Sequence, residues 1–360
     1  DLAINFVDIS WFYYGMENFK KVIIRQLGIK VVTVFLVLTF VQSDQDGFKY
    51  LLCFSVPTFF GYLLMWRNVR NLIDFSHFRK IKPFRHMKGL IVMFIPFVAI
   101  LLFAHIDKFL IGYLTDMTQV GLYDMSFRFI ALSIGLSTAV SSVLMPNIAS
   151  AYAQGKKRYL KNTLSKALEV SMFLGSLAFL CLYFVAPLVI PWFLSDAFAD
   201  AIDIVRTLSY VALLKSLAVL LGSGFMIAIQ RERTYIVMIW ISLLINIFLN
   251  ILLIPKFGAK GAAFASVISE GFLVINLLAA VRPFLLKESH NGIVKYALAV
   301  VLVFLAIRFL DVFLIPSVFS MVVMSVFVSG LYCFTLFFLF KQQYVFDMAK
   351  ELFFKRTEND

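Results

Sequence analysis

Seven of the ionisable side chains inside the long apolar stretches of this sequence are candidates for chemistry. The basic ones are Lys215, Arg128, Lys108 and Arg206, and the acidic ones are Glu270, Asp107 and Asp124. A charge at bilayer depth costs on the order of 2.5–3.5 kcal/mol on insertion scales unless it is paired or hydrated, so each is a candidate functional residue. We predict that the basic side chains contact an anionic ligand. The carboxylates are predicted to bind and release a proton or Na⁺.

The same residues also have a purely structural interpretation. Lys215 and Glu270 lie near the middle of their apolar stretches, and the other five lie in the outer half of theirs. Asp107 with Lys108, or Lys215 with Glu270, can form ion pairs that only hold helices together. The sequence leaves the ligand-binding and the packing interpretations open.

Residue spacings typical of catalysis or metal binding do not occur in the chain. It has no G-x-x-x-x-G-K-[ST] phosphate-binding loop and no H-E-x-x-H motif. The cysteines are isolated in apolar segments, at Cys53, Cys181 and Cys333, and the four histidines are scattered. We therefore predict no catalytic residues, no metal, no cofactor and no enzymatic activity. Asn246 and Asn250, one helical turn apart, are predicted to form hydrogen bonds between helices.

The composition indicates a protein that lies in a membrane. Of the 360 residues, 61% are hydrophobic and only 15% are charged, and the mean hydropathy is +0.90. Soluble domains are about half apolar and a quarter charged because their surfaces face water. The net charge of +12 would suggest a nucleic-acid partner in a soluble protein. Here the basic residues lie between apolar stretches, so we predict no nucleic-acid partner.

The apolar stretches are long enough to cross a bilayer as helices, which needs roughly 20 residues each. They lack the two-residue alternation of barrel strands. We predict about ten spans, near 20–41, 48–65, 89–113, 119–146, 164–187, 203–229, 234–254, 260–281, 293–311 and 319–340. Pro255–Gly258 is predicted to be a tight turn, and Pro187 with Pro191 is predicted to end a helix.

The distribution of charge gives an independent test of these spans and their orientation. Cytoplasmic loops of membrane proteins carry an excess of Lys and Arg. Of the 33 basic residues, 25 lie at alternate junctions between the predicted spans, whereas the intervening junctions are mainly acidic. This alternation places the C-terminus in the cytoplasm.

Three segments resemble a known family. They are Trp11–Glu17, Asp107–Gly112 followed by Val120–Tyr123, and Asn246–Ala263, which is followed by Ser269 and Glu270. In this order they resemble the polysaccharide (O-antigen-type) flippases of the multidrug/oligosaccharidyl-lipid/polysaccharide exporter superfamily. The third segment is the most specific, because it joins two spans by a fixed turn and opens the next helix with small residues.

The resemblance implies an all-α integral membrane protein, a polytopic helical bundle with the two-lobe exporter fold. Members have twelve to fourteen spans in two six-helix lobes. Because the chain begins with Asp1 rather than Met, we expect a fragment that lacks about the first four spans. Residues 1–66 would then end the N-terminal lobe, and 67–88 would form a basic cytoplasmic linker. Residues 89–281 would form the C-terminal six-helix lobe, and 282–360 two extra spans and a cytoplasmic tail.

The resemblance also implies a function, namely that a secondary-type flippase moves undecaprenyl-diphosphate-linked oligosaccharide repeat units across the bacterial cytoplasmic (inner) membrane by alternating access. The product would serve surface polysaccharide biosynthesis, beside membrane lipid and polysaccharide polymerase or assembly proteins as partners. Lys215 and Arg128 would be the first contacts of the diphosphate, and Tyr123 and Tyr210 would stack on sugar rings. Three alternatives stay open: a multidrug/cation antiporter, a flippase for a lipid-linked peptidoglycan precursor, and a membrane-embedded glycan polymerase. The absence of an outward loop above about twenty residues argues against the polymerase.

Overall fold

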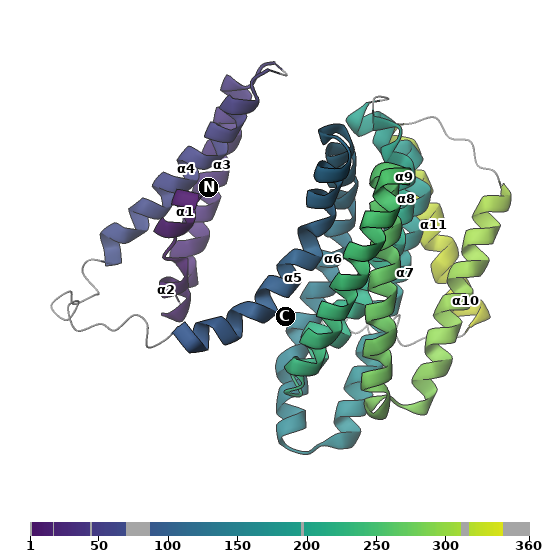
Figure 1. Ribbon diagram of the computed structural model, residues 1–360. Helices are drawn as coiled ribbons and strands as arrows, with labels where there is room; N and C mark the ends of the chain where they lie inside the picture. Colours follow the sequence, from purple (N-terminus) through teal and green to yellow (C-terminus); the bar gives the residue numbers. More distant parts are fainter. Residues whose placement is uncertain are drawn as a thin grey trace, which may run out of the picture. The chain divides into compact units, whose positions relative to one another are not determined.

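The computed structural model describes residues 2–16, 18–43, 45–69, 87–195, 198–310 and 317–340. Within these ranges every regular element is a helix. The chain divides into two compact units, Asp1–Lys88 and Gly89–Asp360 (Figure 1). The predicted all-α membrane fold is confirmed, because eight helical segments of the described residues are long and apolar enough to cross a membrane.

The first unit is a helical hairpin with two short helices packed at one end. Its elements are α1 (Leu2–Val7), α2 (Ser10–Gly15), α3 (Phe19–Phe40) and α4 (Gly47–Val69). The Tyr13 hydroxyl donates a hydrogen bond to the Met65 carbonyl at 2.9 Å, which ties α2 to α4. The Arg25 guanidinium lies 4.3 Å from the centre of the Tyr62 ring and ties α3 to α4. Residues 70–86, which make up most of the predicted linker, lie outside the described residues.

The second unit is a bundle of long helices (Figure 1). Its elements are α5 (Met87–Leu114), α6 (Met117–Ala153), α7 (Lys157–Leu194), α8 (Ala201–Ala218), the π-helix η4 (Val219–Met226), α9 (Glu232–Val281), the 3₁₀ turn η5 (Arg282–Phe284), α10 (Lys287–Leu310), α11 (Val318–Phe334) and the π-helix η6 (Thr335–Leu339). Large apolar side chains such as Leu180, Leu221 and Phe225 are fully enclosed between these helices. Others, such as Phe109 and Phe309, are exposed on the outside, where lipid would cover them.

Two helices are longer than the spans predicted for them. The spans were predicted at 119–146 and 164–187, but α6 continues to Ala153 and α7 already begins at Lys157. At 1.5 Å per residue each helix is about 55 Å long, well beyond the roughly 30 Å hydrocarbon core. The α6–α7 hairpin therefore extends past the predicted membrane boundary.

The prediction that Pro187 and Pro191 end a helix is wrong, because α7 runs through both prolines to Leu194. A proline inside a helix leaves the carbonyl four residues earlier without its N–H partner. For Pro187 that carbonyl belongs to Tyr183, and the side chain of Arg206 on α8 donates to it from 3.5 Å. A neighbouring helix thus supplies the missing donor.

The turn predicted at Pro255–Gly258 is confirmed, but the backbone departs from helical geometry only at Gly258. The helical conformation continues through Pro255 and breaks at Gly258, which has φ 56° and ψ −137°. An L side chain rarely adopts this conformation, which explains the glycine. The helix then restarts, and the side-chain oxygen of Gln119 on α6 accepts from the Ala259 N–H at 2.9 Å. The second half of α9 (259–281) opens with small buried residues, which allow close packing against neighbouring helices.

Candidate functional site

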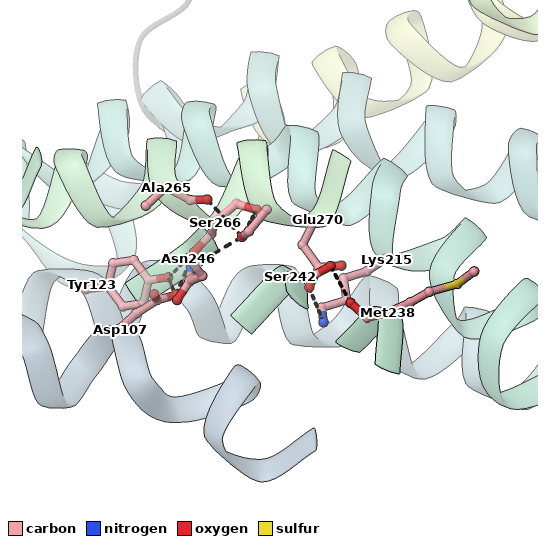
Figure 2. Close-up of polar contacts among 10 residues, drawn as sticks. Asp107, Tyr123, Lys215, Met238, Ser242, Asn246, Ala265, Ser266 and Glu270 are labelled. Atoms are coloured by element: carbon pink, nitrogen blue, oxygen red, sulfur yellow. Dashed lines mark hydrogen bonds and ion pairs between the residues drawn. The ribbon is translucent and has the colours of Figure 1, made fainter. Parts of the chain in front are cut away.

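Lys215 and Glu270 form an ion pair inside the second unit (Figure 2). Lys215 lies on α8, one turn before the helix changes to the π-helix η4, and Glu270 lies on the second half of α9. The Lys215 side chain is 21% exposed and that of Glu270 only 4%. The Lys215 ammonium also lies 4.8 Å from the centre of the Phe103 ring on α5. The ion pair thus joins α8 to α9, and the contact of the ammonium with the Phe103 ring joins both to α5.

One carboxylate oxygen of Glu270 is not bound by Lys215. Glu270 binds Lys215 through Oε1, while Oε2 is buried and has no hydrogen-bond partner among the described residues. A buried carboxylate oxygen without a donor costs on the order of 1–3 kcal/mol. The pair therefore keeps one unused acceptor at a depth where a proton or a small cation would stabilise it.

A second polar cluster surrounds Asp107 on α5 (Figure 2). Its carboxylate is 6% exposed. It accepts hydrogen bonds from the Tyr123 hydroxyl and the Ser266 hydroxyl, each at 2.6 Å, and from the Asn250 amide at 2.7 Å. These three donors come from α6 and from the two halves of α9. The cluster therefore joins α5, α6 and α9 around one negative charge.

The two asparagines extend this cluster. The Asn250 amide also donates to the Asn246 side-chain oxygen at 3.0 Å, and the Asn246 amide donates to the Ser269 hydroxyl at 3.3 Å. The predicted hydrogen bonding of both residues between helices is confirmed. The side-chain oxygen of Asn250 is buried without a donor within the described residues.

The Asp107 cluster and the ion pair lie on one face of the same helix segment. Ser266, Ser269 and Glu270 have the spacing i, i+3 and i+4, which places them on one side of the second half of α9. Figure 2 shows Ser266 toward Asp107 and Glu270 toward Lys215. The two serines were not predicted as site residues, although this spacing beside an intramembrane Glu could have identified them.

Lys108 and Arg128 share one carboxylate at a more exposed position. Both form ion pairs with Asp124, from Lys108 on α5 and, at 3.0 Å, from Arg128 one turn along α6. The side chain of Arg128 is 66% exposed, whereas those of Lys108 and Asp124 are about a quarter exposed, at 28% and 27%. Asp107 and Lys108 do not pair with each other, because neighbouring residues on a helix point in different directions. Each instead has partners of its own.

The remaining predicted contacts differ in exposure. Arg206 is half-buried, and its guanidinium lies 5.3 Å from the centre of the Tyr183 ring. Tyr210 is 42% exposed and packs on Phe179. The prediction that Tyr123 stacks on a sugar ring is wrong for this structure, since that ring is 1% exposed and its hydroxyl is bound to Asp107. Within the described residues no group of three or more His, Cys, Asp or Glu gathers as a transition metal would require.

The sequence matches a family described as polysaccharide biosynthesis proteins over residues 12–203, which is more than half of its length. The chain belongs to this family. The predicted family is thereby confirmed. This polysaccharide biosynthesis protein is 28% identical over 190 residues to a probable flippase, AglR, of Haloferax volcanii. It is 25% identical over 167 residues to a probable low-salt glycan biosynthesis flippase, Agl15, of the same organism.

These alignments cover only part of each protein. They take in 50% and 46% of this chain, but only 37% of AglR and 35% of Agl15. The family member thus spans little more than a third of the length of the relatives it matches.

The fold has a counterpart among solved structures. The lipid II flippase MurJ in an inward closed conformation superposes with a TM-score of 0.70 at 17% sequence identity. The superposition covers 85% of this chain and 66% of that protein. At this identity the likeness concerns the fold alone, and it shows that the family member shares the helical fold of that structure.

Proposed function

We propose that the protein is a secondary-type flippase that moves an undecaprenyl-diphosphate-linked oligosaccharide across the bacterial cytoplasmic membrane for surface polysaccharide biosynthesis. The observation that carries this proposal is the family match over residues 12–203. The multi-pass helical fold supports it, because such a protein offers a route through the bilayer. In this proposal the C-terminus is cytoplasmic, the protein is not an enzyme, and a polysaccharide polymerase or assembly protein receives the product.

The basic residues would bind the diphosphate by exchanging partners. Lys215, Lys108 and Arg128 each form an ion pair with a carboxylate in this structure, so each would have to leave that partner to bind a ligand. A substrate diphosphate that takes Lys215 would leave Glu270 without its cation, in a position only 4% exposed. An unpaired charge at that depth is costly. Uptake of a proton or Na⁺ by Glu270 would offset that cost and so couple the two events.

Reciprocity follows from this exchange. If a cation on Glu270 favours binding of the diphosphate to Lys215, then the diphosphate must favour binding of the cation by the same factor. Asp107 provides a second carboxylate beside the same face of the second half of α9, surrounded by hydroxyl and amide groups that suit a proton or Na⁺. The flippase would then alternate between inward-open and outward-open states, driven by an ion gradient rather than by ATP.

Flipping in reconstituted vesicles tests the proposal. The complete protein is placed in liposomes with a fluorescent polyprenyl-diphosphate oligosaccharide, and the fraction that becomes accessible to a membrane-impermeant quencher is measured. We expect protein-dependent accessibility that responds to an imposed proton or Na⁺ gradient. Lys215→Ala and Arg128→Ala should reduce the rate severalfold or more. Lys49→Ala is the control, because Lys49, whose side chain is 59% exposed, pairs with Asp46 at the start of α4, away from the Lys215–Glu270 pair.

Two results would contradict the proposal. Vesicles that flip no sugar lipid but expel cationic dyes would favour the antiporter. Full activity of both variants, with flipping by the unaltered protein, would remove Lys215 and Arg128 as head-group contacts.

A further inference from the structure

A long groove lies between α6 and α7 where the two helices approach their connecting turn. Its larger part has a volume of about 680 Å³, and a smaller part of about 320 Å³ adjoins it at Tyr159. The α6 side is formed by residues 140, 143, 144, 147, 150 and 154, which recur every three or four positions and therefore share one face of the helix. Residues 159, 162, 163, 166 and 170 form the same kind of stripe on α7.

The lining of this groove changes from apolar to polar along its length. One end is formed by Val140, Val143, Leu144 and Val170. The other end carries Asn147, Ser150, Gln154, Tyr159, Asn162 and Thr163. The change falls at residues 146 and 164, where the hydrophobic spans were predicted to end and to begin. With these boundaries the apolar end would lie at the depth of acyl chains, and the polar end would extend beyond it on the side predicted to be cytoplasmic.

Most of the polar side chains at this end form no hydrogen bond with other described residues. Among the described residues, the side chains of Asn147, Asn162 and Thr163 form no hydrogen bond, and Gln154 bonds only Ser150, at 3.0 Å. The ring of Tyr159 is 52% exposed above them. In the Asp107 cluster each donor has an acceptor. The polar end of the groove instead presents amide and hydroxyl groups without hydrogen-bond partners among the described residues, beside the exposed ring of Tyr159.

This combination fits a carbohydrate. Sugar hydroxyls both donate and accept hydrogen bonds, as do side-chain amides and hydroxyls. An apolar sugar face can pack on an exposed aromatic ring, which offers contact area at low entropic cost. Lys166 lies at the level where the lining changes character, and Lys156 lies at the tip, so a phosphate at the membrane surface would meet a positive charge.

We propose that this groove is a cytoplasmic docking site for the sugar-diphosphate head group of the lipid-linked oligosaccharide. The sugars would lie against Tyr159, Asn162 and Asn147, the diphosphate would lie near Lys166, and the start of the prenyl chain would follow the apolar end. An ordinary anionic phospholipid is a poorer fit, because most of the polar lining consists of neutral groups that a simple phosphate head group would leave unused. The inference rests on the proposed flippase function.

The test separates docking from translocation. In the liposome assay, the initial flipping rate of the complete protein is measured against the mole fraction of the fluorescent sugar lipid. Tyr159→Leu combined with Asn162→Leu should raise the half-saturating mole fraction about tenfold, as the loss of a ring contact and an amide hydrogen bond implies. The maximal rate should stay within about twofold. Tyr159→Phe keeps the ring and should restore most of the affinity.

Tyr152→Leu is the matched control. Tyr152 is a 40% exposed tyrosine on the same hairpin and does not line this groove. Its substitution should change neither the half-saturating mole fraction nor the maximal rate. The thermal stability of each variant in detergent checks that the hairpin is intact.

A photoreactive sugar lipid provides a readout that does not require flipping. It should label the α6–α7 hairpin of the unaltered protein, and an excess of unlabelled sugar lipid should abolish the labelling. The inference is overturned if the groove variants keep the unaltered half-saturating mole fraction, or if phosphatidylglycerol competes as well as the sugar lipid does. Absence of any sugar-lipid flipping by the unaltered protein would instead contradict the flippase function itself.

Discussion

Removal of either partner of the Lys215–Glu270 pair should destabilise the protein strongly. Taking one member from a buried ion pair costs about 3–5 kcal/mol, because the other charge stays buried without compensation. Lys215→Met leaves Glu270 at 4% exposure, so we expect a loss of about 5 kcal/mol in the free energy of unfolding. Glu270→Met leaves Lys215 at 21% exposure and beside the Phe103 ring, so we expect a loss of about 3 kcal/mol in the free energy of unfolding.

The double variant Lys215→Met with Glu270→Met distinguishes a true pair from two independent residues. Replacing a buried pair by apolar side chains is neutral or stabilising by about 1–4 kcal/mol, so the double variant should be more stable than either single one. The free energy of unfolding of the complete protein is measured in mixed detergent micelles. The pair of Lys260 and Asp203, 2.7 Å apart and with side chains 40% and 57% exposed, serves as control, and Lys260→Met should cost no more than about 1 kcal/mol.

Additive losses in the cycle, or single losses below about 1 kcal/mol, would refute the structural reasoning. The same double variant also separates packing from transport. If partner exchange at Lys215 couples flipping to an ion gradient, the variant should fold and yet lose the response of flipping to that gradient. A folded double variant with unchanged gradient dependence would restrict the pair to a packing role.

Two further predictions concern the turns. Gly258→Ala should lower the free energy of unfolding by about 1–3 kcal/mol, because φ is +56° and a Cβ atom there would lie 2.6 Å from the Gln119 side-chain oxygen. Gly271→Ala is the control for the same unfolding measurement. It should be neutral, because the nearest side-chain atom to a Cβ atom there is 4.0 Å away. In the turn before α4, the bond from Lys49, followed by backbone N–H groups of the turn, lowers the pKa of Asp46 from 3.8 to about 2. The stabilisation of this turn is therefore present above pH 3.8 and lost as the pH falls through about 2, and Lys49→Ala should raise the pKa in an NMR titration of labelled Asp46.

The membrane class, the existence of the apolar spans and the charges inside them followed from the sequence alone. Lipid imposes a long apolar stretch on every spanning helix, and this requirement is local to each stretch. The glycine at position 258 is equally local, since its backbone conformation is one that other residues rarely adopt. Residue types also identified Lys215, Glu270 and Asp107 as candidates, because a buried charge needs an explanation wherever it occurs.

Only the tertiary structure decided which partner each charge has. Lys108 lies next to Asp107 in sequence yet pairs with Asp124, and Asp107 is bound by donors from residues up to 159 positions away. The same holds for Pro187, where a distant arginine supplies the donor that lets the helix continue. Hydrogen bonds and ion pairs depend on distances of about 3 Å between helices. Those distances are set by how whole helices pack, which no stretch of residues encodes by itself.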